Sequence, residues 1–291
     1  MASQITSTIR YGLIAGNGQF PFLVLEAARS RGIEMVVAAI REEASPELAA
    51  RASRLHWLSL GELSRLIEVF KQEGVSRAVM AGQVRHNKIF SSIRPDWKLV
   101  KVLMSLREKN TDALIGGVAK VLLEEGIVLE DSTIFLQPLL AGAGVLTRRA
   151  PNDEEQRNIS YGLKIARELA RMDIGQSIVV AGQACVAVEA MEGTDAVIRR
   201  AAQLAAGQPL TVVKVSKPAQ DMRFDVPVVG MSTIEVMRES GATALSIDAG
   251  KALLFDRDAM LAAADEAGIA MVGTPLAAAE HPETIRAVTG K

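Results

Sequence analysis

The stretch Tyr11–Pro21 (YGLIAGNGQFP) decides the fold class of this chain. Its first five residues are apolar or small, as in a buried strand, and Phe20–Arg31 has the apolar spacing of a helix. Gly16 and Gly18 allow a tight turn between the two, and Pro21 suits the first helical turn, where a backbone N–H has no helical partner. This strand, turn and helix predict the opening of a βαβ unit.

The same alternation continues on the carboxyl side of this stretch. Glu34–Ile40 and Arg77–Ala81 are predicted strands with apolar residues facing both ways, which is typical of a parallel sheet covered by helices. Gly61–Glu73 and Thr111–Gly126 are predicted helices, and Ser132–Leu140 is predicted as a strand or an extended link. We therefore predict an α/β fold that opens with a Rossmann-like parallel sheet.

A second domain is predicted after the segment Ala141–Pro151 (AGAGVLTRRAP), which is rich in glycine, is basic and ends in proline. We expect an N-terminal Rossmann-like domain at 1–142 and a C-terminal α/β domain at 143–291, joined by a linker. The second domain is predicted to begin with a long charged helix, Asp153–Met172, capped by Asn152 or Asp153.

Composition excludes several functional classes for these 291 residues. The 33 basic and 34 acidic residues leave a net charge of −1, and aromatic residues make up only 4%, so nucleic-acid binding is not expected. Cys185 is the one cysteine, which excludes an internal disulfide and a cysteine-based zinc site. The polar segment Met1–Arg10 does not have the pattern of a secretory leader, and a cytoplasmic location is expected.

The glycines at Gly16 and Gly18 are the first candidate site, because backbone N–H groups at a helix amino end can approach a phosphate. The match to a dinucleotide fingerprint is partial: Pro21 occupies the third small-residue position, and Arg41 stands near the end of the second strand, where an acidic residue is expected. A tight turn without a ligand is the alternative.

The segment Glu189–Asp195 (EAMEGTD) is the second candidate, predicted between a strand and a helix. Its three carboxylates, which include Glu189 and Asp195, are suited to a hard cation such as Mg²⁺. The turn at Gly193 and Thr194 can offer backbone N–H groups to a phosphate. The alternative is a helix cap surrounded by solvated acids.

The third candidate, residues 214–227 (KVSKPAQDMRFDVP), combines both charges between two predicted strands. Its cations can bind phosphate oxygens, and its carboxylates can bind a metal ion or orient water. The cations are Lys214, Lys217 and Arg223, and the carboxylates are Asp221 and Asp225. The alternative is a surface loop with cancelling charges. Asp248, further on, is predicted to belong to a turn at a strand end.

Taken in order, these segments resemble the LpxI family, the UDP-2,3-diacylglucosamine pyrophosphatases of lipid A biosynthesis. The resemblance runs from about Ile9 to Gly273, and its motifs are YGLIAGNGQFP at 11–21, GQV at 82–84, DALIGGVA at 112–119, EAMEGTD at 189–195, KVSKPAQDMRFDVPVV at 214–229 and GATALSIDAG at 241–250. The resemblance implies hydrolysis of a lipid-linked UDP-sugar to UMP and 2,3-diacylglucosamine 1-phosphate (lipid X) with Mg²⁺ or Mn²⁺. It also implies a homodimer and transient contact with the inner membrane.

On this basis we assign roles to individual residues. The family's critical aspartate lies in an R-F-D-x-P motif and corresponds to Asp225. We predict that the C-terminal domain, 143–291, is the catalytic one. The predicted catalytic residues are Asp225 and Asp221, and the predicted metal ligands are Asp225, Asp221, Glu189 and Asp195. The predicted substrate-binding residues are Gly16, Gly18, Gln83, Gly193, Thr194, Lys214, Lys217 and Arg223.

Two other functions are consistent with the residues alone. One is an NAD(P)-dependent oxidoreductase that uses the turn at Gly16 and Gly18. The other is a non-catalytic UDP-sugar-binding protein in which the acidic residues only cap helices.

Overall fold

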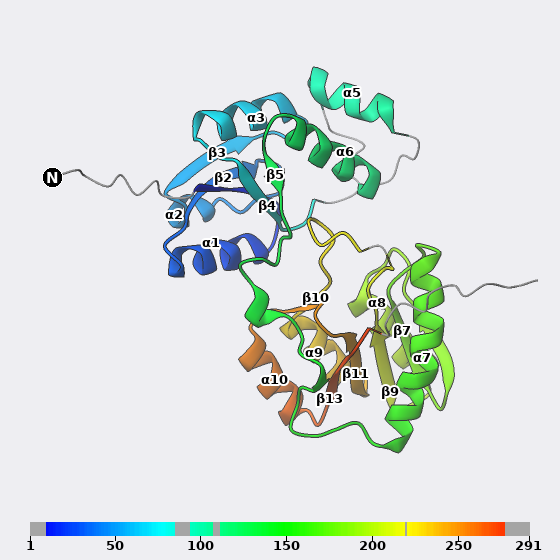
Figure 1. Ribbon diagram of the computed structural model, residues 1–291. Coiled ribbons are helices and arrows are strands. Elements are labelled where there is room, and N and C mark those ends of the chain that lie inside the picture. Colours follow the sequence, from blue (N-terminus) through cyan, green and yellow to red (C-terminus); the bar gives the residue numbers. More distant parts are fainter. Residues whose placement is uncertain (1–9, 85–93, 107–110, 219, 277–291) are drawn as a thin grey trace, which may run out of the picture. The chain divides into compact units, whose positions relative to one another are not determined.

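The computed structural model describes residues 10–84, 94–106, 111–218 and 220–276. The chain divides into two units (Figure 1): unit 1 is Met1–Pro138 with Asp221–Val226, and unit 2 is Leu139–Gln220 with Pro227–Lys291. The division after Pro138 lies close to the predicted boundary at 142. The grouping of Asp221–Val226 with unit 1 was not predicted, and the chain consequently passes from one unit to the other three times.

Unit 1 is built on a parallel sheet with the strand order β3-β2-β1-β4-β5, which confirms the predicted Rossmann-like arrangement. The strands are β1 (Arg10–Ala15), β2 (Glu34–Ile40), β3 (Arg54–Leu58), β4 (Arg77–Ala81) and β5 (Val128–Leu129). The helices are α1 (Phe20–Ser30), α2 (Leu48–Arg51), α3 (Leu63–Gln72), α5 (Trp97–Ser105) and α6 (Thr111–Glu124). Neither β3 nor α5 was predicted.

The central strand β1 makes room for the helices that pack on the unit 1 sheet. One face of the sheet packs against α3, α5 and α6, whose buried side chains include Phe70, Leu99 and Leu122. A Cβ at Gly12 would lie 2.6 Å from the Phe70 ring, so the glycine gives the ring room to rest on the strand. The connection from β3 to β4 crosses to the other side of β1, and the strand order therefore reverses between β1 and β4.

The segment after β5 corrects one prediction. Between Ser132 and Leu140 the chain forms turns and the short 3₁₀-helix η1 (Gln137–Leu139). The prediction of a strand was therefore wrong: the segment is a link, and it is built of turns rather than extended backbone. Arg31 holds this link by donating to the carbonyl oxygens of Ile134 and Phe135 at 3.1 and 2.9 Å.

Unit 2 is built on a mixed sheet with the order β6-β13-β11-β9-β7-β8. Its strands are β6 (Gly144–Val145), β7 (Ser177–Ala181), β8 (Ala184–Val188), β9 (Leu210–Lys214), β11 (Ala242–Asp248) and β13 (Ala270–Thr274), and β10 (Val228–Val229) pairs separately with β12 (Leu253–Leu254). Its helices are α7 (Asp153–Arg171), α8 (Thr194–Leu204), α9 (Met231–Glu239) and α10 (Arg257–Glu266). Strands β9, β11 and β13 are parallel, whereas β7 is antiparallel to β9 and to β8.

Helices cover both faces of this second sheet (Figure 1). Helix α7 begins as predicted, with Asn152 and Glu155 forming a reciprocal capping box. It approaches the sheet closely at Gly162, where a Cβ would lie 2.7 Å from a methyl group of Val213. Helices α8, α9 and α10 pack against the other face.

Candidate functional site

Strand directions bring polar residues together at one edge of the unit 2 sheet. Lys214 ends β9 and is paired in register with Ser177 at the beginning of β7, and with Ile247 near the end of β11. Glu189 follows the last residue of β8, and its N–H donates to the Ser177 carbonyl at 2.9 Å. We call this the carboxyl edge of unit 2, because β9 and β11 end there. Ligands of open α/β sheets bind at such edges.

Thr194, the first residue of α8, is the centre of a polar cluster on this edge. Lys214 Nζ donates to Thr194 Oγ1 at 2.8 Å, and Thr194 Oγ1 donates to Glu189 Oε1 at 3.1 Å. The Ser177 hydroxyl lies 3.1 Å from the same threonine oxygen. A threonine hydroxyl has one proton, and Glu189 receives it, so the Ser177 hydroxyl must donate to Thr194. Three of the predicted site residues, Glu189, Thr194 and Lys214, therefore meet here. Ser177 belongs to the same cluster and was not predicted.

The Thr194 cluster joins one positive and one negative side chain through a neutral hydroxyl. Glu189 is only 9% exposed, and Lys214 is half-buried. Buried charges require hydrogen-bonded partners, and the hydroxyl supplies one to each. Gly193, the N-cap of α8, has a φ of 87°, which favours glycine. The amino end of α8 therefore lies beside a lysine ammonium, an arrangement favourable to a phosphate group.

Asp195 and Lys217 have partners that the sequence did not indicate. Asp195 Oδ1 accepts a hydrogen bond from Thr233 Oγ1 at 2.8 Å, which links the first turns of α8 and α9. Lys217 Nζ lies 2.7 Å from Asp173 Oδ1, and its backbone N–H donates to Gln220 Oε1 at 2.6 Å. Both side chains are therefore engaged in holding the local fold.

Asp248 is the functional candidate that sequence reasoning missed, since it was expected only in a turn. It is the last residue of the central strand β11 and is only 2% exposed. Its Oδ2 accepts a hydrogen bond from the Ser216 N–H at 2.7 Å. Among the described residues, Oδ1 finds no hydrogen-bond donor, and Arg167 Nη2 lies 3.5 Å from it. Burial raises the pKa of this carboxyl above its usual value. A buried carboxyl with spare acceptor capacity, at the end of a central strand, has the features of a functional group.

The segment Asp221–Val226 carries three of the predicted residues into unit 1. Both oxygens of Asp221 accept from Arg223, at distances from 2.6 to 3.1 Å, and this ion pair lowers the pKa of Asp221. The Asp225 N–H donates to the Asp221 carbonyl at 2.9 Å and closes the turn. Ser132 holds the segment: its N–H donates to the Met222 carbonyl at 2.9 Å and its hydroxyl to the Arg223 carbonyl at 2.6 Å.

The glycine turn of unit 1 lies where the strand order reverses. Asn17 and Gln83 form a backbone bridge at 2.8 and 3.1 Å, which joins the ends of β1 and β4. A Cβ at Gly16 would lie 2.7 Å from the Gln83 carbonyl oxygen, and Gly18 has a φ of 92°. Close backbone approach therefore explains Gly16, and the turn conformation explains Gly18. The point between β1 and β4 is also where ligands bind in sheets of this topology.

The predicted residues are divided between the two units. Unit 1 contains Gly16, Gly18, Gln83, Asp221, Arg223 and Asp225, and unit 2 contains Glu189, Gly193, Thr194, Asp195, Lys214 and Lys217. Among the residues that the structure describes, no group of three or more His, Cys, Asp or Glu side chains is placed to hold a metal ion.

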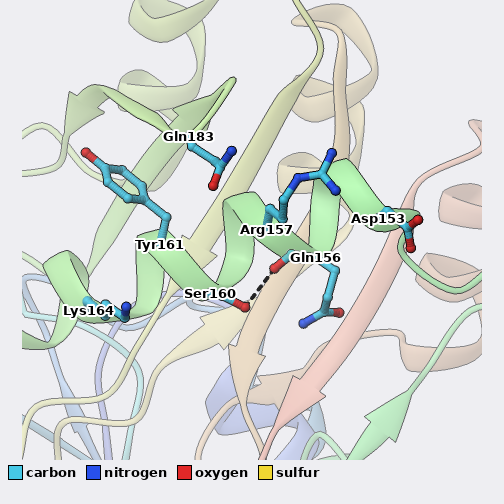
Figure 2. Close-up of a pocket in the computed structure, with 7 residues that line it drawn as sticks. All are labelled: Asp153, Gln156, Arg157, Ser160, Tyr161, Lys164 and Gln183. Carbon is cyan, nitrogen blue, oxygen red and sulfur yellow. Dashed lines mark hydrogen bonds between the residues drawn. The ribbon is translucent and has the colours of Figure 1, made fainter.

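A pocket of about 450 Å³ lies elsewhere in unit 2, along α7. Its lining comes from α7 and from the turn after β7, namely Asp153, Gln156, Arg157, Ser160, Tyr161, Lys164 and Gln183 (Figure 2). These side chains are spread along the helix and do not converge on one point. Gln183 follows the carboxyl end of β7, beside the amino end of β9, so the pocket lies at the sheet edge opposite the Thr194 cluster. None of the predicted site residues lines it.

Comparison with known proteins gives a consistent result over most of the chain. A family model described as the LpxI N-terminal domain matches residues 10–150, and one described as the LpxI C-terminal domain matches residues 142–272. A protein of Caulobacter vibrioides named UDP-2,3-diacylglucosamine pyrophosphatase LpxI is 34% identical over 274 residues, covering 91% of this chain and 97% of its own length.

Similarity to solved structures is weak. A CobK precorrin-6A reductase has 14% identity and a TM-score of 0.30, over 92% of this chain and 89% of its own. The biotin carboxylase domain of the Hydrogenobacter thermophilus 2-oxoglutarate carboxylase has 11% identity and a TM-score of 0.27, over 60% of this chain and 35% of its own. Within the described part of the chain, every helix is too short or too polar to cross a bilayer.

Proposed function

Because this chain belongs to the LpxI family, we propose that it hydrolyses the pyrophosphate of UDP-2,3-diacylglucosamine and releases UMP and 2,3-diacylglucosamine 1-phosphate (lipid X). The observation that carries this proposal is the match to a pyrophosphatase of that name over 97% of its length, together with both domain models. The chain is thus a pyrophosphatase by family, and its substrate and products are the proposal.

The polar groups of the site suit a pyrophosphate substrate. Hydrolysis of a phosphoanhydride is slow, because its negative oxygens repel a nucleophile and because charge builds up on the leaving phosphate. Lys214 lies at the amino end of α8, and both groups attract phosphate oxygens. Arg223 is held by Asp221 in a forked pair, which fixes the direction of its guanidinium group. We propose that each of these cations binds phosphate oxygens, Lys214 in unit 2 and Arg223 in unit 1.

Asp225 is the proposed catalytic carboxylate. Its backbone closes the Asp221–Val226 turn, so the position of its Cα is fixed by hydrogen bonding. In our proposal the carboxylate orients the attacking water and accepts its proton. Asp221 is the weaker candidate for this role, because both of its oxygens already accept from Arg223. We propose that Asp221 instead positions Arg223.

We also propose that turnover requires Mg²⁺ or Mn²⁺. The available donors are carboxylate oxygens, which hard cations prefer, and Mg²⁺ is usually held by one or two carboxylates together with substrate phosphates. A protein cage of three acidic residues is therefore not required for this mode of binding. Asp225 is the proposed carboxylate ligand, because it is the aspartate of the R-F-D-x-P motif. When bound, the ion would neutralise phosphate charge.

The experiment incubates the purified full chain with UDP-2,3-diacylglucosamine and Mg²⁺ and measures UMP and lipid X by mass spectrometry. Asp225→Asn should lower turnover by about 10²–10⁴-fold, the usual contribution of a general base. Asp258→Asn, an exposed acid in the first turn of α10, is the matched control and should retain the wild-type rate. Chelation should stop turnover, and added Mg²⁺ or Mn²⁺ should restore it.

Two results would count against the proposal. Absence of UMP release by the folded wild-type protein in the presence of metal would favour a non-catalytic UDP-sugar-binding protein. Near-normal activity of a folded Asp225→Asn variant would remove Asp225 from the mechanism.

We further propose that the protein is a homodimer and that it works at the cytoplasmic face of the inner membrane. The diacylated substrate in the name of the relative supports the membrane location, since two acyl chains keep a lipid in a bilayer, and the homodimer is what the family resemblance implies. Light scattering tests the dimer at several protein concentrations, and a concentration-independent monomer mass would refute it.

A further inference from the structure

The outer face of α5 in unit 1 has an unusual composition for a surface exposed to water. Trp97 is 68% exposed and Met104 is 81% exposed, although both are large apolar side chains. Positions i, i+4 and i+7 share one face of a helix, so Trp97, Lys101 and Met104 lie on the same side of α5. Lys101 is exposed as well. We call Trp97, Lys101 and Met104 the outer stripe of α5.

The opposite side of α5 anchors the helix to unit 1. Leu99 and Val102 are buried in the core with α3 and α6. Asp96 is the N-cap: its side chain accepts the Leu99 N–H at 3.0 Å and the Ser64 N–H at 2.5 Å. Figure 1 shows α5 on the outside of unit 1, beside α6. The outer stripe is therefore held outward by a fixed inner face.

Charge on the outward side of α5 is positive. Lys101 Nζ lies 5.2 Å from the centre of the Trp97 ring, so a cation and an aromatic ring share one patch. Arg94, just before the helix, is exposed as well. Asp96 is the one acidic residue in the segment 94–106, and it is turned inward as the N-cap. Lys98 is directed to Glu125 on the α6 side.

We propose that the outer stripe of α5 docks on the surface of an anionic lipid bilayer. Tryptophan prefers the boundary between head groups and acyl chains, and methionine gains by leaving water. Lys101 and Arg94 match the negative charge of phospholipid head groups. This inference rests on the proposed function, which supplies the reason for docking: a diacylated substrate remains in the bilayer, so the enzyme must reach it there.

The first experiment follows Trp97 fluorescence, with the full-length Trp57→Phe variant used so that Trp97 is the one indole. Vesicles of phosphatidylethanolamine and phosphatidylglycerol (3:1), without substrate, should shift its emission to the blue, and brominated acyl chains should quench it. Vesicles of phosphatidylcholine alone should produce a much smaller change. An emission spectrum that anionic vesicles leave unchanged would overturn the proposal.

The second experiment measures vesicle co-sedimentation of variants. Lys101→Glu changes the charge by two, and at about 1 kcal/mol per charge it should weaken partitioning by about 30-fold. Met104→Ser should weaken partitioning, whereas Met172→Ser in unit 2, a methionine of similar exposure at 66%, should not. Equal binding by all variants would refute the assignment. Conversion of a dimer to a monomer by Met104→Ser would show that the stripe contacts a second copy instead.

A third measurement separates this inference from the proposed function. Lys101→Glu should hydrolyse substrate in detergent micelles at the wild-type rate and substrate in anionic vesicles more slowly. If the wild-type protein hydrolyses neither form, the proposed function fails, while the substrate-free vesicle results remain valid. If it hydrolyses both but Trp97 does not respond to vesicles, the docking surface alone is refuted.

Discussion

Replacing Thr194 by alanine removes the hydroxyl at the centre of the carboxyl edge of unit 2. The variant loses the donation from Lys214 at 2.8 Å, the donation to Glu189 at 3.1 Å and the contact with Ser177 at 3.1 Å. A net hydrogen bond is worth about 0.5–1.5 kcal/mol, and one to a charged group about 1.5–3 kcal/mol. Since bonds that share one atom are not additive, we expect a loss of about 2–3 kcal/mol in the free energy of unfolding.

The stability assay is urea denaturation followed by circular dichroism, supported by calorimetry. A loss of 1 kcal/mol lowers Tm by about 2–4 °C for a unit of this size, so the unit 2 transition of Thr194→Ala should fall by about 4–12 °C. Thr194→Ser is the matched control, because it keeps the hydroxyl and removes only a methyl group. It should recover most of the lost stability.

The same pair of variants tests the role of the cluster in hydrolysis. If Thr194 directs Lys214 toward the substrate phosphate, Thr194→Ala should lower kcat, and Thr194→Ser should restore it. Measurement of UMP release at saturating substrate reports kcat for each folded variant. If serine and alanine gave the same stability and the same kcat, the hydrogen bonds of Thr194 would have no energetic role, and our reasoning about the cluster would be wrong.

Three further predictions concern other parts of the structure. The Asp248→Asn variant should become more stable relative to wild type as pH rises from about 4 to 8. Burial raises the folded-state pKa of Asp248, so the stability that the protonated carboxyl contributes at low pH is lost as the carboxyl ionises. If the Tm of variant and wild type had the same pH dependence, this prediction would be wrong. Gly82→Ala should disrupt the backbone bridge that joins the ends of β1 and β4, since its Cβ would lie 2.5 Å from the Asn17 carbonyl oxygen. Gly74→Ala, also at positive φ but in open space, should cost only about 1 kcal/mol in urea denaturation. Arg223→Ala should allow the pKa of Asp221 to rise toward its usual value, which NMR titration of the carboxyl carbon would detect; an unchanged titration curve would refute the pairing.

Local signals in the sequence predicted most of the fold. The strand, turn and helix of residues 11–31 are encoded by apolar runs and glycines that act over a few residues, and the same holds for the capping box of α7. The edge strand β3 was missed because its sequence, RLHWL, mixes polar and apolar residues, and four of its five residues are only partly buried. Edge strands have one paired side, and their hydrophobic pattern is correspondingly weak.

The candidate site could be predicted only in part. Glu189, Thr194 and Lys214 stand at strand ends or helix beginnings, and the sheet brings such positions to a common edge. The burial of Asp248 depends on the registers of β9, β11 and β13, which no local pattern specifies. The place of Asp221–Val226 in unit 1 depends on Ser132, about ninety residues earlier in the chain, and such long-range contacts leave no mark on local composition.

The three passages of the chain between the units have a consequence for synthesis on the ribosome. Residues 1–138 leave the exit tunnel first, but the segment that Ser132 holds in unit 1 is translated only after much of the second sheet. The first unit is therefore incomplete until residue 226 has emerged. A gene divided after codon 138 would give two products, and the amino-terminal one would lack part of its own fold. Any dissection of this protein into separately expressed pieces should carry residues 221–226 along with the first piece, as a tethered or added peptide.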